Sequence, residues 1–121
     1  MELIIKEVQQ ACQTMLDSQN CSKWFYGAFG KIYLRNRNYY IKNVSLNFLV
    51  FSNLSIKPDL RGCKILTTMV DDLIKRNVNL YFEGVENPRL ADYLTRCGFQ
   101  LDLNDHAFNS FYKLGCLNEN C

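Results

Sequence analysis

The sequence is poor in the residues from which metal centres and disulfide frameworks are built. It has one histidine, His106, and its six cysteines include no C-x-x-C pair, so the ligand spacing of a tetrahedral zinc site is absent. No apolar run approaches the length that spans a bilayer, and the first residues lack the basic and apolar regions of a signal peptide. We therefore expect a cytoplasmic protein that holds no metal, has no membrane contact and keeps its cysteines as reduced thiols.

The chain also has little excess of charge. Fourteen Lys and Arg oppose twelve Asp and Glu, which leaves a net charge of +2 spread from Lys6 to Lys113. A general nucleic-acid binder carries a larger and more clustered positive charge, so this balance argues against nucleic acid as a partner.

Length and apolar content indicate one folded unit. The chain has 121 residues, of which 48% are apolar and 13% aromatic, and this is enough for one core but not for two. We expect a single domain at residues 1–114 and a frayed tail at residues 115–121.

The strongest pattern lies between Leu46 and Ile74. Residues 46–56 are apolar and β-prone, and Pro58 and Asp59 end that strand. From residue 61 onward the apolar side chains recur every three or four positions, which predicts an amphipathic helix. A strand that turns into a helix directs backbone N–H groups and the positive helix end at one point, and that arrangement suits a phosphate.

The same reasoning predicts the other elements. In chain order they are a β-prone opening at 2–6, a helix at 7–18, a hairpin with strands 31–35 and 39–44 joined by 36–38, a strand at 78–82, a helix from Pro88 to Gly98, and strands at 99–103 and 107–114. The strand, helix and strand from residue 46 to residue 82 predict two parallel strands. Asn87 fits a helix N-cap, and Gly98 fits a left-handed helix stop.

Two features have a structural and a functional interpretation. The aromatic run from Trp24 to Phe29 closes a core more often than it binds a substrate, and both interpretations stay open. His106, on a turn between two strands, is expected to be a solvated or capping residue rather than a base.

Two segments resemble motifs of a known family. Residues 56–65 resemble the acyl-CoA motif R/Q-x-x-G-x-G/A of the GNAT (Gcn5-related) N-acetyltransferases, and residues 86–99 resemble the family's next helix with its terminal Gly-Phe. Together they cover about the second half of the chain, which is most similar to short, phage-borne members. The resemblance implies an α/β (α+β) fold, with a mixed, mostly antiparallel sheet splayed between two parallel central strands and helices on both faces.

The resemblance also implies acetyl-CoA as co-substrate and a set of residues that bind it. These cofactor-binding residues are Leu54, Ser55, Ile56, Arg61, Gly62, Cys63, Lys64, Ile65, Leu66 and Asn87. Lys64 and Leu66 depart from the family because they stand where small residues let the pyrophosphate approach the backbone. Lys64 either pairs with a phosphate or narrows the site.

Acetyl transfer from a thioester to an amine needs groups that handle charge and protons. A backbone N–H near Leu54 or Ser55 is placed to polarise the thioester carbonyl. Glu83 and Glu86 are the candidate bases, and Tyr93 is the candidate acid, with Tyr81 and Cys97 as alternatives. The family's usual tyrosine acid falls at Leu94. In the structural interpretation, the glutamates are solvated loop charges and Tyr93 belongs to the core.

Three functions follow. The first is an N-acetyltransferase that moves an acetyl group from acetyl-CoA directly to a primary amine on a protein lysine, an N-terminus or a small molecule. The second is a catalytically impaired GNAT-shaped module that binds CoA or a protein partner. The third is a nucleic-acid-binding module that uses the aromatic residues with Arg35 and Arg37, and the modest charge argues against it. We also expect that the chain can form a homodimer through its last strands.

Overall fold

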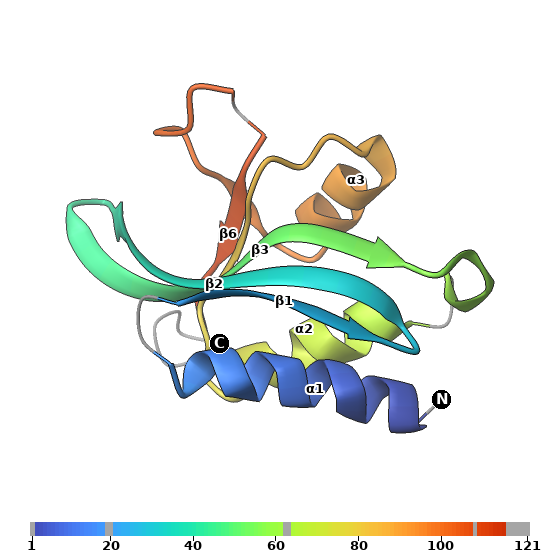
Figure 1. The fold of residues 1–121 in the computed structure, drawn as a ribbon. Coiled ribbons are helices and arrows are strands. Elements are labelled where there is room, and N and C mark those ends of the chain that lie inside the picture. Colours follow the sequence, from blue (N-terminus) through green and yellow to red (C-terminus); the bar gives the residue numbers. More distant parts are fainter. Residues whose placement is uncertain (1, 19–20, 62–63, 108, 116–121) are drawn as a thin grey trace.

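The computed structural model describes residues 2–18, 21–61, 64–107 and 109–115, which form a twisted six-stranded sheet in the order β1-β2-β3-β4-β6-β5 with three α-helices (Figure 1). The elements are α1 (Glu2–Leu16), β1 (Ser22–Gly27), β2 (Gly30–Ile41), β3 (Val44–Ile56), the short 3-10 helix η1 (Pro58–Leu60), α2 (Ile65–Lys75), β4 (Leu80–Phe82), α3 (Pro88–Arg96), β5 (Gln100–Leu101) and β6 (Phe111–Lys113). The mixed and mostly antiparallel sheet confirms the predicted fold class.

The two central strands, β3 and β4, are parallel, as the sequence predicts. They pair only from Leu49 opposite Leu80 to Phe51 opposite Phe82. The N–H of Glu83 still donates to the carbonyl of Phe51 at 3.0 Å, after which β3 runs on alone through residues 52–56. The sheet therefore opens between its two central strands.

Helix α1 begins earlier than the sequence pattern predicts. The expected β-prone opening at 2–6 is wrong, because these residues form the first turns of α1. Ile4 packs against the core and extends the buried stripe that continues with Val8 and Met15. Three consecutive apolar residues at 3–5 are too few to distinguish a strand from a helix, and the tertiary contact of Ile4 decides the outcome.

The predicted hairpin turn at residues 36–38 is also wrong. Strand β2 runs through these residues without a break, and the chain turns at Lys42 and Asn43, whose φ angles are 52° and 67°. Positive φ at both positions is typical of a type I′ turn. The side chain of Asn36 is used in the sheet instead, where its Oδ1 accepts a hydrogen bond from Asn47 at 2.6 Å.

One row of residues identifies the face of the sheet that carries the helices. Asn36, Leu49, Leu80 and Lys113 lie opposite one another on four neighbouring strands, so their side chains share a face. Asn36 Nδ2 donates to the carbonyl of Met15 in α1 at 2.9 Å. We call this side of the sheet the helix face.

The other two helices lie on the helix face as well, and Figure 1 shows α1 and α2 beneath the sheet. Met69 and Leu73 of α2 share a core cluster with Leu49, and Lys113 Nζ donates to the carbonyl of Cys97 at the end of α3 at 2.6 Å. The expectation of helices on both faces is therefore wrong for the described residues. Both crossovers, β3 to β4 and β4 to β5, advance in one direction across the sheet, and right-handed crossovers of this kind place both helices on one side.

The opposite side, which we call the helix-free face, has its own smaller core. Ile41, Phe48, Val50, Tyr81 and Tyr112 form this second buried cluster. No helix in the described ranges covers it, and none of the described helices is long and apolar enough to cross a membrane.

The helix after β4 has the predicted ends. The Asn87 side chain accepts a hydrogen bond from the N–H of Arg89 at 2.9 Å, Pro88 occupies the first turn, and Gly98 has a φ of 88°. Strands β5 and β6 are shorter than expected. Gly115, placed by the sequence in a frayed tail, is buried and donates to Asn79 at 2.9 Å, and the residues after it lie outside the described part.

Candidate functional site

A cavity occupies the opening between the central strands. Its volume is about 300 Å³, and its walls are the free part of β3 and the segment that leads from β4 to α3. The lining residues are Phe51, Ser52, Asn53, Leu54, Phe82, Glu83, Gly84, Val85, Glu86, Asn87 and Leu90. We call it the splay cavity.

A second cavity, of about 310 Å³, lies where α2 begins. Most of its lining side chains are apolar, and two are cationic. The lining residues are Ile56, Leu60, Arg61, Lys64, Ile65, Leu66, Thr67 and Tyr93. We call it the helix-start cavity. Leu54 and Leu90 line the splay cavity, and Ile56 and Tyr93 line the helix-start cavity, so β3 and α3 supply walls to both. The two cavities therefore lie next to each other along the end of β3, and we call the pair the groove.

The start of α2 suits an anion. Lys64 is the N-cap residue, with a φ of 61° and no side-chain cap among the described residues. The N–H of Thr68 makes the first intrahelical bond, to the Lys64 carbonyl at 3.0 Å, so the N–H groups of residues 65–67 have no intrahelical partner. Arg61 Nε donates to the carbonyl of Ile56 at 3.1 Å, which holds the guanidinium beside the end of β3.

Two buried polar atoms in this groove have no hydrogen bond of normal length. Among the described residues, the buried side-chain oxygens without a hydrogen bond of normal length are Ser52 Oγ and Tyr93 Oη, and the side chains nearest the Tyr93 hydroxyl include Thr67 and Cys97. Ser52 belongs to the splay cavity and Tyr93 to the helix-start cavity. A buried polar group without a partner costs about 1–3 kcal/mol, and such groups are rare outside functional sites.

Ser52 lies at an irregularity in the sheet. Tyr33 of β2 is opposite Asn53 of β3, and the next residue, Leu34, is opposite Phe51, so Ser52 is the extra residue of a β-bulge. The bulge falls just after the last pair of β3 with β4. It changes the direction of β3 where the sheet opens.

The predicted cofactor residues are divided between the two cavities. Leu54 and Asn87 line the splay cavity, and the residues that line the helix-start cavity are Ile56, Arg61, Lys64, Ile65 and Leu66. Ser55 lies on β3 opposite Lys31. Gly62 and Cys63 lie outside the described residues.

Glu83 is fixed by contacts that the sequence did not predict. Arg35 Nη1 lies 3.2 Å and 3.1 Å from its two carboxylate oxygens, and the hydroxyl of Tyr39 donates to it at 3.3 Å. Burial, followed by the charge of Glu83, raises the pKa of Tyr39 above its usual value. No sequence motif links Arg35 to a residue 48 positions away. Glu86 is exposed on the same splay cavity.

The candidate acid, Tyr93, lies apart from the glutamates. Its ring lines the helix-start cavity, and burial raises the pKa of its hydroxyl to about 12. Leu94, which stands at the family's tyrosine position, is fully buried in the core. The groove therefore brings Glu83 and Glu86 together in one cavity and places Tyr93 in the other.

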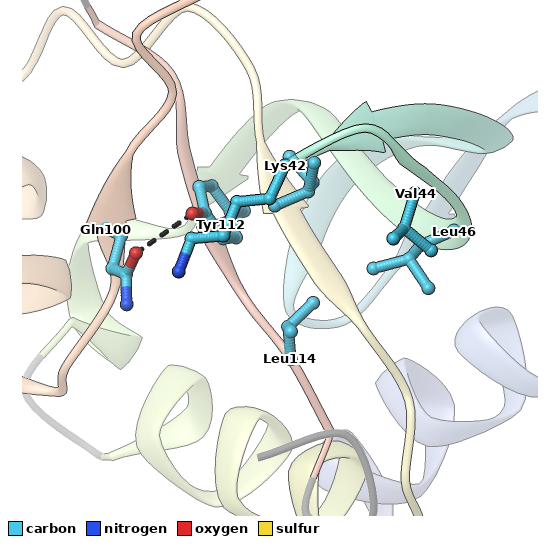
Figure 2. Close-up of a pocket in the computed structure, with 7 residues that line it drawn as sticks. Lys42, Val44, Leu46, Gln100, Tyr112 and Leu114 are labelled. Atoms are coloured by element: carbon cyan, nitrogen blue, oxygen red, sulfur yellow. Dashed lines mark hydrogen bonds between the residues drawn. The ribbon is translucent and has the colours of Figure 1, made fainter.

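A cavity of about 520 Å³ lies at the turn end of the β2–β3 hairpin, away from these residues. Its lining consists of Ile41, Lys42, Val44, Leu46, Gln100, Tyr112 and Leu114, and Figure 2 shows the Val44 and Leu46 side chains together on one side with Gln100 on the other. Tyr112 donates its hydroxyl hydrogen to Gln100 at 2.9 Å. None of the predicted site residues lines this cavity.

The aromatic run at 24–29 is divided between the two faces. Phe29 is buried and Phe25 packs against the core, as the structural interpretation expects. Trp24 and Tyr26 are 37% and 72% exposed, and the Nζ of Lys31 lies 5.4 Å from the Trp24 ring centre. The described cysteines, at positions 12, 21 and 97, are free.

Comparison with known proteins bears on the fold. No family model and no curated protein matches the sequence. Two solved structures of the AtaT Y144F mutant toxin bound to the C-terminus of the antitoxin AtaR are similar, and one of them also contains acetyl-CoA. Identity is 15% and 16%, TM-scores are 0.51 and 0.53, and the match covers 69% and 71% of this chain. The chain spans 57% and 58% of the length of these neighbours. The sheet, its opening and this likeness together identify the fold as GNAT-like.

Proposed function

We propose that the chain is an N-acetyltransferase that moves the acetyl group of acetyl-CoA directly to a primary amine. One observation carries the proposal. The described residues contain two buried polar atoms without a hydrogen bond of normal length, Ser52 Oγ and Tyr93 Oη, and both belong to the groove that starts where β3 leaves β4. A ligand in the groove would supply the missing partners, and the acetyl-CoA bound in a structure of similar fold supports its identity.

The groove has the charge distribution that acetyl-CoA requires. One end of the groove combines Arg61, Lys64 and the N–H groups of residues 65–67, which have no intrahelical partner, and this combination suits a diphosphate. Its middle is apolar, with Ile56 and Leu66 placed beside an extended pantetheine arm. Lys64 and Leu66 line the cavity and leave its volume of about 310 Å³ open, so the departures from the family motif are compatible with binding.

The reaction then takes place in the splay cavity. The amine nitrogen attacks the thioester carbonyl carbon, the C–N bond forms and the C–S bond breaks, and the thiolate leaves. A backbone N–H of β3 near Leu54 stabilises the carbonyl oxygen, and Glu83 accepts a proton from the amine directly or through a water. The cytoplasmic location, the phage origin and the homodimer remain predictions.

A second function competes with this proposal. Leu94 is buried where the family has its acid, and Arg35 already neutralises Glu83, so a module that binds CoA without turnover fits the same residues. The neighbours were solved with the C-terminus of an antitoxin, which supports a protein partner for such a module.

Calorimetry with acetyl-CoA, followed by an assay of thiol release with amines, separates the two functions. We expect binding that weakens about tenfold or more in Arg61→Ala and is unchanged in Arg96→Ala, a matched arginine at the far end of α3. Thiol release that depends on an added amine supports the transferase. Binding of acetyl-CoA without acetyl transfer supports the module that binds CoA without turnover. Absence of acetyl-CoA binding overturns both the transferase and this module.

A further inference from the structure

A third cavity beside the groove lies on the helix-free face. It has a volume of about 410 Å³ and is formed by β2, β4 and the segment at 102–110. Its lining contains three carboxylates and no Lys or Arg. The lining residues are Tyr39, Tyr40, Tyr81, Glu83, Asp102, Asn104, Asp105 and Ser110. Glu83 also lines the splay cavity, so the two cavities meet at this residue. We call it the acidic cavity.

Asp102 is a buried carboxylate without a described counter-ion. It is 7% exposed, and its two oxygens accept hydrogen bonds from the Tyr81 hydroxyl at 2.6 Å and the Asn104 N–H at 3.0 Å. The ion pairs of the described residues join Arg35 to Glu83 and Arg76 to Asp72, so neither involves Asp102. Asp102 is therefore held by hydrogen bonds but has no ion-pair partner among the described residues, and a cation in the cavity would supply one.

Asp105 adds a second negative charge at the same cavity. A hydrogen bond from Ser110, followed by those from the N–H groups of Ala107 and Asn109, holds the pKa of Asp105 below its usual value. Glu83 is already paired with Arg35, whereas no ion pair of the described residues involves Asp102 or Asp105. The cavity therefore favours an occupant with more than one positive charge.

The nature of the cation follows from the remaining walls. The rings of Tyr39 and Tyr81 stack with centres 4.4 Å apart and both residues line the cavity, so part of its wall is aromatic. Within the described ranges, no group of three or more His, Cys, Asp or Glu residues is arranged to hold a metal ion. An organic cation therefore fits the cavity better than a divalent metal ion.

We propose that the acidic cavity binds the acetyl acceptor and that the acceptor is a small aliphatic di- or polyamine. One ammonium lies against Asp102 and Asp105, and the other reaches Glu83 at the border with the splay cavity. The volume of about 410 Å³ is within the range of small-molecule sites. This inference rests on the proposed acetyl transfer. The reacting ammonium loses one proton before its nitrogen attacks the thioester carbon. It loses a second after the C–N bond forms, so the products are the amide, the CoA thiol and one released proton.

The test compares amines of different charge on the intact chain. Spermidine is the probe, ethanolamine carries a single positive charge, and β-alanine is a zwitterion. We expect kcat/KM for spermidine to exceed that for ethanolamine by about tenfold or more, because each ion contact of about 1.4 kcal/mol is worth a factor of ten. Asp102→Asn and Asp105→Asn should each raise the spermidine KM by a similar factor and leave the Kd of acetyl-CoA unchanged. Asp92→Asn, an exposed carboxylate on α3, is the matched control.

Calorimetry with spermidine alone distinguishes the failure of this inference from the failure of the transferase proposal. If spermidine binds, Asp105→Asn weakens that binding and no amine is acetylated, then the acidic cavity is an amine site and the transferase proposal is wrong. Equal use of ethanolamine and spermidine, or preference for a lysine-rich peptide over spermidine, overturns the inference while the transferase stands. Asp105 is only partly buried, so Asp105→Asn gives an answer even where Asp102→Asn fails to fold.

Discussion

Arg35 and Glu83, 48 positions apart in the sequence, form an ion pair in which Arg35 Nη1 lies within 3.2 Å of both carboxylate oxygens. The pair joins the middle of β2 to the point where the chain leaves β4. Because Tyr39 also bonds the same carboxylate, Glu83 is held in one position between the splay cavity and the acidic cavity. This position is the basis of the first prediction.

Glu83→Gln should lower turnover by about a hundredfold or more, because the amide keeps the shape of the side chain but cannot accept a proton. The Kd of acetyl-CoA should not change. Glu86→Gln is the control, since Glu86 lines the same splay cavity but is exposed. Steady-state thiol release with a saturating amine measures both variants. An unchanged rate in Glu83→Gln would exclude Glu83 as the base.

Ser52→Ala should leave the free energy of unfolding unchanged or raise it by up to about 1 kcal/mol, because it removes a buried hydroxyl that has no partner. Ser110→Ala is the matched control. The Ser110 hydroxyl accepts a hydrogen bond from the Gly84 N–H at 3.1 Å, so its loss should cost about 1 kcal/mol. Urea unfolding of both variants checks this expectation. A loss of stability in Ser52→Ala equal to that in Ser110→Ala would show that Ser52 has a partner.

Lys64→Gly should raise the free energy of unfolding by about 1 kcal/mol, because Lys64 has a left-handed φ of 61° that glycine adopts without strain. It should change the Kd of acetyl-CoA as well, with direct phosphate pairing by Lys64 giving weaker binding and a steric role giving tighter binding. Lys42→Gly is the control, since Lys42 has a φ of 52° at the β2–β3 turn, far along the chain from the groove. It should stabilise the fold similarly without any change in Kd.

Cys12 should make the fold sensitive to alkali. Burial raises the pKa of its thiol from 9.0 to about 12, so the folded state holds this proton more tightly than the unfolded chain does. The resulting stability is fully present below pH 9 and is lost as the pH rises toward 12. Between about pH 8 and about pH 10.5 the loss should be about 2 kcal/mol.

Urea unfolding at the two pH values tests this expectation with two variants. Cys12→Ala should lack this part of the alkaline loss, whereas Cys21→Ala, at an exposed position, should retain it. The same alkaline loss in wild type and Cys12→Ala would contradict the prediction.

The parts of the fold that the sequence predicts are those with strong local signals. Helix α3 has a capping asparagine, a proline in its first turn and a glycine stop, and each has the expected conformation. The apolar spacing of α2 and the crossover rule were enough to predict a parallel pairing of β3 with β4.

The wrongly predicted hairpin turn is explained by contacts between segments that are distant in the sequence. Asn36 resembles a turn residue in the sequence, but its side chain is used by Met15 and Asn47, so β2 continues through it. The true turn, at Lys42 and Asn43, lacks the glycine that usually marks such a hairpin.

In the candidate site, too, the sequence does not predict residues that only the fold brings together. The motif resemblance predicts residues that line the groove, but it contains no information about Arg35, Tyr39 or Asp102. These residues meet Glu83 and Tyr81 only because the strand register brings them to one face.

The placement of all three described helices on one face separates two kinds of evolutionary change. Along β2 and β3, alternate positions point either to the helices or to the helix-free face, so neighbouring codons serve different purposes. A substitution on the helix-free face, for example at Tyr39, therefore changes one side of the sheet without touching the layer that packs against the helices.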